Sequence, residues 1–181
     1  MKKVYDLEQL AQALKDGETK ISISFKDCSH LYKVLKEDYG VDLNDFDIRF
    51  WDTSNVTNMS YMFMYFKYFN QPIGTWNTSN VTDMSGMFYC AKSFNQPLND
   101  WDTSNVTDMS GMFANAVSFN QPLNNWNTSS VTDMRCMFMY SEYFNQPLNN
   151  WDTSKVTNMS CMFTGAKSFN QPLKNWNASN I

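Results

Sequence analysis

Residues 101–125 read WDTSNVTDMSGMFANAVSFNQPLNN, and close variants of this stretch follow one another five times between Trp51 and Asn175. A sixth copy begins at Trp176. The tryptophans mark the period, because each lies 25 residues after the one before: Trp51, Trp76, Trp101, Trp126, Trp151 and Trp176. A fixed period between about 20 and 50 residues is typical of solenoids and other repeat arrays. The sequence therefore predicts a stack of near-identical units over residues 51–181.

The repeat also explains the composition. The chain has 181 residues with 13 Met and 6 Trp, and Asn44 is the only asparagine before residue 50. Lys and Arg number 14 against 18 Asp and Glu, which gives a formal net charge of −4. This balance excludes binding of nucleic acid that is driven by electrostatics. Runs of about 18 apolar residues are missing from the sequence, so we predict no insertion into a membrane.

The spacing of apolar residues within a unit predicts a strand, a turn, a short helix and a return loop. Leu98, Trp101 and Thr103 have the spacing of the strand in a leucine-rich repeat. Apolar residues then follow in the pattern of one helix face: Met109, Met112, Phe113 and Ala116. Thr107 or Asp108 is placed to cap this helix. The expected fold class is an α/β repeat, a leucine-rich-repeat-like right-handed solenoid with one parallel sheet.

Stacking places equal positions of successive units above one another. One column consists of asparagines that can hydrogen-bond as an amide ladder: Asn70, Asn95, Asn120, Asn145 and Asn170. The column after each tryptophan alternates Asp and Asn, so its like charges stand two units apart. Asp83, Asp108 and Asp133 stack directly, a cost that we expect N–H groups at the helix starts to offset.

Residues 1–50 lack the repeat and are predicted to form an N-terminal capping region with the order helix, strand, helix, strand. These elements are expected at residues 7–14, 21–25, 31–35 and 46–50, and Gly17 and Gly40 end the two helices. The C-terminal end shows no comparable cover. Self-association of two copies through that end is therefore an alternative, structural role.

The sequence offers little catalytic or metal chemistry. His30 is the only imidazole, and we interpret it and the nearby Cys28 as polar residues that cap a helix rather than as a catalytic pair. We expect no cofactor and no metal, because each unit supplies only one stacked carboxylate and the cysteines have no C-x-x-C spacing. Cys136 and Cys161 share one slot in neighbouring units, within reach of a disulfide, although two free thiols are favoured.

The tryptophan column has two interpretations. Burial is favoured, because Trp occupies the inward position of the expected strand, and its indole N–H groups then need partners such as backbone carbonyls. The alternative is an exposed column of indoles that stacks against a glycan.

Two sets of exposed residues are candidates for binding a partner, which is expected to be a protein or a glycan. The favoured set flanks each tryptophan on the expected polar sheet face: Asp100, Asp102, Asn125, Asn127, Asn150 and Asp152. The second set lies in the most variable slots of the repeat and consists of Tyr65, Tyr89 and Tyr140. Tyrosine is a residue type that the cores of interfaces favour.

The motifs W-[DN]-T-S-x-V-T-[DN]-M-x-x-M-F and F-N-Q-P-L, in residues 51–181, resemble the mycoplasma-type branch of the BspA-like leucine-rich-repeat family. The resemblance implies a curved solenoid, a non-enzymatic role in adhesion or protein binding, and a place on a bacterial cell surface. The residues after Met1 do not form a signal peptide, so either the chain is cytoplasmic as written or a leader has been removed from it.

Overall fold

The computed structural model describes residues 1–176, so the rest of the partial sixth unit lies outside the described residues. Its helices and strands all lie in the first 50 residues: β1 (Lys2–Val4), α1 (Leu7–Lys15), β2 (Ile21–Ile23), α2 (Leu31–Tyr39) and the short 3-10 helix η1 (Leu43–Asp45). β1 and β2 pair in parallel, with Lys2 opposite Ile21. The stretches predicted as the two helices are therefore helical. The strand expected at 46–50 does not form, and the Gln71 side chain binds the backbone there instead.

Local capping explains where the two helices begin and end. Asp6 caps α1, because its side chain accepts a hydrogen bond from the Gln9 N–H at 2.8 Å. The buried face of α1 consists of Leu10, Ala11, Ala13 and Leu14. α2 ends at Gly40, which adopts the left-handed conformation (φ 66°) that glycine allows without a steric cost.

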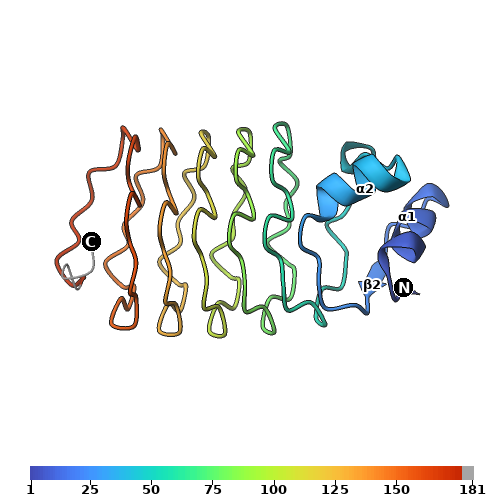
Figure 1. Ribbon diagram of the computed structural model, residues 1–181, viewed down its shortest axis with the longest axis horizontal. Helices are drawn as coiled ribbons and strands as arrows, with labels where there is room; N and C mark the ends of the chain where they lie inside the picture. Colours follow the sequence, from blue (N-terminus) through green and yellow to red (C-terminus); the bar gives the residue numbers. More distant parts are fainter. Residues whose placement is uncertain (177–181) are drawn as a thin grey trace.

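Beyond residue 50 the 25-residue units lie side by side, and each repeats the path of the one before, while α1 and α2 lie at the N-terminal end of the row (Figure 1). Neighbouring units are joined at the residue before the first methionine of each unit by isolated parallel bridges: Asn58–Asp83, Asp83–Asp108, Asp108–Asp133 and Asp133–Asn158. The first unit joins the capping region in the same way, because Asn58 pairs with Asp27, and a further bridge joins Asp52 to Ser22 of β2.

The short helix predicted in each unit is wrong. Within residues 51–176 the backbone forms successive tight turns: the N–H of Met112 donates to the Met109 carbonyl at 3.2 Å, and that of Ala116 to the Phe113 carbonyl at 2.9 Å. Gly111 and Asn115 adopt positive φ (60° and 57°) within these turns, which a right-handed helix excludes. Because such turns also bring every third residue inward, their apolar pattern imitates that of a helix.

The strand predicted around each tryptophan, at Leu98, Trp101 and Thr103 in one unit, is also wrong within the repeat. The Trp101 N–H donates to the Leu98 carbonyl at 3.1 Å, which closes a turn. The Asp102 side chain then accepts from the Ser104 N–H at 3.0 Å and forms a second, Asx-type turn. Leucine and tryptophan point inward here because of turn geometry, so their spacing does not require extended backbone.

Columns of aromatic side chains form the core along the stack. Phe113 stacks on Phe88 and on Phe138, with ring centroids 5.6 Å apart in both pairs. The predicted burial of the tryptophans is confirmed, since Trp101 is only 3% exposed. Its indole N–H donates to the Ile73 carbonyl at 3.2 Å, and Trp76, Trp126, Trp151 and Trp176 make the equivalent bond. The alternative of an exposed tryptophan column that binds glycans is therefore wrong.

Polar side chains add a second set of bonds between units. The Thr103 hydroxyl donates to the Asn127 carbonyl at 2.9 Å, and Thr107 to the Thr82 carbonyl at 3.1 Å. The asparagine column forms where it is predicted, but the side-chain oxygens of its first four members accept from the backbone of the next unit: the Asn120 N–H, for example, donates to Asn95 Oδ1 at 3.0 Å. The polar side chains of the repeat motif thus hold neighbouring units in a fixed register.

Candidate binding surface

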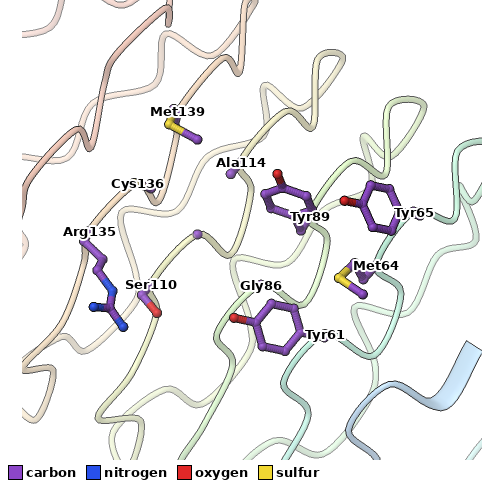
Figure 2. A pocket seen from close by; sticks show the side chains of 11 residues that line it. Tyr61, Met64, Tyr65, Gly86, Tyr89, Ser110, Ala114, Arg135, Cys136 and Met139 are labelled. Atoms are coloured by element: carbon purple, nitrogen blue, oxygen red, sulfur yellow. The ribbon is translucent and has the colours of Figure 1, made fainter. Parts of the chain in front are cut away.

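One face of the stack carries a groove of about 380 Å³ that crosses four units (Figure 2). Its walls are mainly tyrosine and methionine: Tyr61, Met64, Tyr65, Tyr89 and Met139. Its floor consists of small residues: Gly86, Ser110, Gly111, Ala114 and Cys136. Arg135 completes the lining. Pockets that bind ligands are concave and mostly apolar, with few polar groups, and this groove has that character. It is the candidate binding surface of the chain.

The backbone positions these side chains by alternating the direction of its hydrogen bonds. In the first unit the N–H groups of Tyr61, Phe63 and Tyr65 donate to carbonyls of the next unit at 2.8–2.9 Å. The N–H groups in between are used for turns within the unit. Tyr61 and Tyr65 have positive φ (54° and 59°), which directs their side chains outward, while Phe63 is fully buried. Tyr65 is 62% exposed as a result.

Glycines at two positions make room for the tyrosine rings. A Cβ atom on Gly86 would lie 2.2 Å from Cε1 of Tyr61, so this ring lies directly against the backbone of the next unit (Figure 2). Gly165 receives the ring of Tyr140 in the same way, with Cδ1 2.2 Å from such an atom. Gly111 has no neighbour within 4 Å of that position, which leaves the floor of the groove open there.

The capping region continues this face by one further turn. Asp27 pairs with Asn58, and the N–H of His30 donates to the Ser60 carbonyl at 3.0 Å, as the next units do among themselves. His30 has the same positive φ as Tyr61 (54° for both), and the two rings stack at 5.0 Å. The prediction that the His30 side chain caps a helix is wrong, since it makes no capping hydrogen bond with α2.

The sequence contained a signal for this extra turn. Residues 27–32 read DCSHLY and align with NMSYMF at residues 58–63, so Cys28 takes the place of a buried methionine. Burial raises the pKa of the Cys28 thiol to about 12, which keeps it protonated and unreactive at neutral pH.

The groove is nearly uncharged. Arg135 lies at one edge and pairs with Asp133, with Nε and Oδ2 3.3 Å apart. The rings of Tyr65 and Tyr89 meet edge to face at 5.5 Å. Neighbouring Cys90 and partial burial raise the pKa of Tyr89 above its usual value of 10.0, so its hydroxyl is a neutral hydrogen-bond donor at pH 7. The groove therefore offers aromatic surface and hydroxyl groups rather than charge.

The six polar residues predicted as the favoured binding set are all exposed, but they lie in turns and not on a sheet. Asp102, Asn127 and Asp152 each use a side-chain oxygen to accept the N–H of the serine two residues later, at 2.9–3.1 Å. The other three are Asp100, Asn125 and Asn150. Among the described residues, these six do not contribute to the groove.

The structure separates the three predicted tyrosines. Tyr65 and Tyr89 line the groove, whereas Tyr140 lies outside it, half-exposed and over Gly165. Tyr61, Met64 and Met139 are lining residues that the predicted set lacks, although Tyr61 occupies a varied slot of the repeat. Comparison of the repeats therefore indicated the right slots, but not which of them converge.

Other chemistry is sparse in the part of the chain that the structure describes. Within residues 1–176, no three His, Cys, Asp or Glu side chains converge as a metal site would require. All four cysteines are unbridged in the structure, Cys136 and Cys161 included. The described helices are also all too short or too polar to cross a membrane.

The fold and the groove define a repeat protein with an exposed aromatic surface. The family model DUF285, described as a Mycoplasma protein of unknown function, matches residues 26–129 and again residues 97–181, so the chain belongs to this family. The first match begins at the turn that the capping region adds to the repeat face. No curated protein and no solved structure matched the chain.

Proposed function

We propose that the chain is a non-enzymatic protein-binding module that holds its partner in the tyrosine- and methionine-lined groove. We further propose that its fold is a leucine-rich-repeat-like right-handed solenoid of the BspA-like type, a family that its repeat motifs resemble. The observation that carries the binding proposal is the groove itself, in which Tyr61, Tyr65 and Tyr89 stand partly exposed around a floor of small residues.

The residue types favour a protein as the ligand. Tyrosine and methionine are enriched in the cores of protein interfaces. Tyrosine buries much area for little loss of entropy, and the flexible methionine side chain adapts to the shape of a partner. The tyrosines are also held in place before a partner arrives: Tyr61 lies between His30 and Gly86, and Tyr65 contacts Tyr89. Such preorganisation lowers the entropic cost of binding.

The polar turns beside the tryptophans are the weaker candidate. Asp102, Asn127 and Asp152 already accept backbone hydrogen bonds from serines of their own units. Their alternation of Asp with Asn in successive units fits this structural role, because either side chain supplies the accepting oxygen. A partner on this surface would compete with the turns for those oxygens.

Matched variants separate the two surfaces. The groove variant Y65N/Y89A uses the residues that the same slots hold in the third unit, Asn115 and Ala114, so the backbone geometry is preserved. The turn variant D102N/D152N keeps the accepting oxygens and removes two charges. Unchanged thermal unfolding would show that both variants fold.

The wild-type chain is used to capture a protein from mycoplasma extract and surface fractions, and the captured protein is purified and titrated calorimetrically. We expect Y65N/Y89A to weaken its binding by roughly tenfold or more, as loss of interface aromatics does, and D102N/D152N to leave it unchanged. The reverse order of effects would contradict the proposal, as would a wild-type chain that binds no protein saturably.

A further inference from the structure

Cys136 and Cys161 lie directly beside each other in neighbouring units. Both occupy the slot that Tyr61, Gly86 and Gly111 hold elsewhere, and both have the left-handed backbone of that slot (φ 55° and 58°). The Cys136 N–H donates to the carbonyl of Ser160 at 2.9 Å, which fixes the register between the two residues. Burial, followed by the neighbouring Cys161 thiol, raises the pKa of the Cys136 thiol.

The spacing of the units fits a disulfide only under strain. Backbones paired in this way lie about 4.7–4.9 Å apart, and a disulfide accepts Cα atoms about 4.4–6.8 Å apart. Because the two cysteines share one backbone conformation, their Cα–Cβ bonds are parallel and their Cβ atoms are also separated by about one unit spacing. This exceeds the Cβ separation of about 3.5–4.5 Å that disulfides prefer. A bridge here is reachable with a small movement and is more easily reduced than a relaxed one.

The pair differs from the other two cysteines because it combines an exposed thiol with a second thiol in the adjacent unit. Cys161 is exposed, and Cys136 is half-buried at the floor of the groove. Cys28 is fully buried, and Cys90 has Tyr65 and Asn115 in the adjacent units of its column rather than a second thiol. The Asn115 side chain donates to Cys90 Sγ at 3.2 Å.

We propose that Cys136 and Cys161 form a reactive dithiol site that low-molecular-weight disulfides oxidise to a bridge between neighbouring units. The thiolate of Cys161, the more accessible of the two, attacks one sulfur of the small disulfide and releases one small thiol. The Cys136 thiolate then attacks Cys161 Sγ in this mixed disulfide and releases the second small thiol. The two cysteines lose two electrons and two protons, and the small disulfide gains them.

The test exposes the folded wild-type chain to glutathione disulfide and maps the products after digestion with trypsin. Cleavage after Arg135, Lys155 and Lys167 separates the two cysteines into peptides 136–155 and 156–167. We expect these peptides to be joined by a disulfide without bound glutathione, and dithiothreitol to restore both thiols. Wild-type protein that carries glutathione on each cysteine separately, or that reacts at Cys90 but at neither member of the pair, would overturn the proposal.

Single variants provide the control for the second step. Cys136→Gly and Cys161→Gly use the residue that the same slot holds in Gly86 and Gly111, so the turn is preserved. In Cys136→Gly, Cys161 is expected to retain bound glutathione, since no second thiol displaces it. If Cys136 reacts in Cys161→Gly, it is expected to retain glutathione for the same reason. Cys90→Asn, which copies Asn115, is expected to form the bridge as the wild type does. Rapid loss of glutathione from Cys161 in Cys136→Gly would contradict the assigned partner.

Discussion

At the scale of single residues, one slot of the repeat decides the local fold. It holds Tyr61, Gly86, Gly111, Cys136 and Cys161, all with φ between 54° and 60°. A left-handed conformation costs a residue other than glycine about 1–2 kcal/mol. The inter-unit hydrogen bonds of this slot, such as Gly111 N–H to the Arg135 carbonyl at 2.8 Å, offset that cost. Tyrosine and cysteine give no sign of this conformation in the sequence, which is why a helix is predicted there.

Gly86→Ala tests how closely the Tyr61 ring lies against the next unit. The new Cβ atom would lie 2.2 Å from Cε1 of Tyr61, whereas the Cβ atom in Gly111→Ala has no neighbour within 4 Å. Gly111→Ala is expected to lower the free energy of unfolding by about 1 kcal/mol through its positive φ alone. Gly86→Ala is expected to cost more, because the ring has to move. Urea denaturation measures both.

The control for this pair is the background Tyr61→Gly, in which the ring is absent. The extra cost of Gly86→Ala is expected to disappear there, so the two alanine variants become equally stable. If Gly86→Ala is no more destabilising than Gly111→Ala in the wild-type background, the placement of the Tyr61 ring is wrong.

The turn after Trp101 makes stability depend on pH. Hydrogen bonds from Ser104 lower the pKa of Asp102 below its usual 3.8. A carboxyl whose pKa is lower in the folded state stabilises the fold above its unfolded pKa, and this contribution is lost as the pH falls through the folded value. The melting temperature of the wild type is therefore expected to fall as the pH drops from about 5 to below the usual carboxyl pKa of 3.8, and that of Asp102→Asn to fall less. Equal falls would contradict the role of this carboxylate.

At the scale of the element, the unit is built from turns that side chains close. Asp108 Oδ1 accepts the Ser110 N–H at 2.8 Å, and Asn58 and Asn158 make the same bond in their units. The predicted role of this column, to satisfy backbone N–H groups at the start of a segment, is therefore right, although the segment is a series of turns and not a helix. The sequence predicted that these side chains accept backbone N–H groups, but it did not predict the turn conformation of that backbone.

Asp108 tests the two effects of this column separately. Asp108→Ala removes the accepting oxygen and is expected to cost about 1 kcal/mol of unfolding free energy. Asp108→Asn keeps the oxygen and removes one of three stacked charges, so it is expected to be neutral or stabilising, most clearly at low salt. Urea denaturation at two ionic strengths distinguishes these outcomes. An asparagine variant as unstable as the alanine variant would show that the charge itself is needed.

The capping region was easier to predict than the repeat unit. α1 and α2 lie where apolar spacing and the glycines at positions 17 and 40 predict helices. Their N–H groups bond within each helix, so local sequence determines them. In the repeat the equivalent N–H groups donate to the next unit. The local spacing of apolar residues does not reveal a hydrogen-bond partner 24 residues away. In the repeat, these contacts between units determine the backbone conformation instead of the local helix preference.

At the scale of the whole molecule, the period of the sequence predicted the columns correctly. The tryptophans are buried and the asparagine column forms, because both follow from placing equal slots side by side. The groove was not predictable to the same degree. It depends on which outward slots carry large rings and which carry glycine in adjacent units, as Tyr61 and Gly86 do. Whether a slot points outward depends on the local path of the backbone, and the 25-residue period does not reveal that path.

Deletion of one unit tests most directly that the 25-residue period is the structural unit. Removal of residues 101–125 joins Asp100 to Trp126 and leaves every remaining unit intact, whereas removal of residues 101–112 shifts the register of the turns. Both deletions lose one tryptophan, so unfolding in urea followed by tryptophan fluorescence compares them fairly. We predict a cooperative transition for the first deletion and an unfolded or severely destabilised chain for the second. Equal stability of the two deletions would contradict the account.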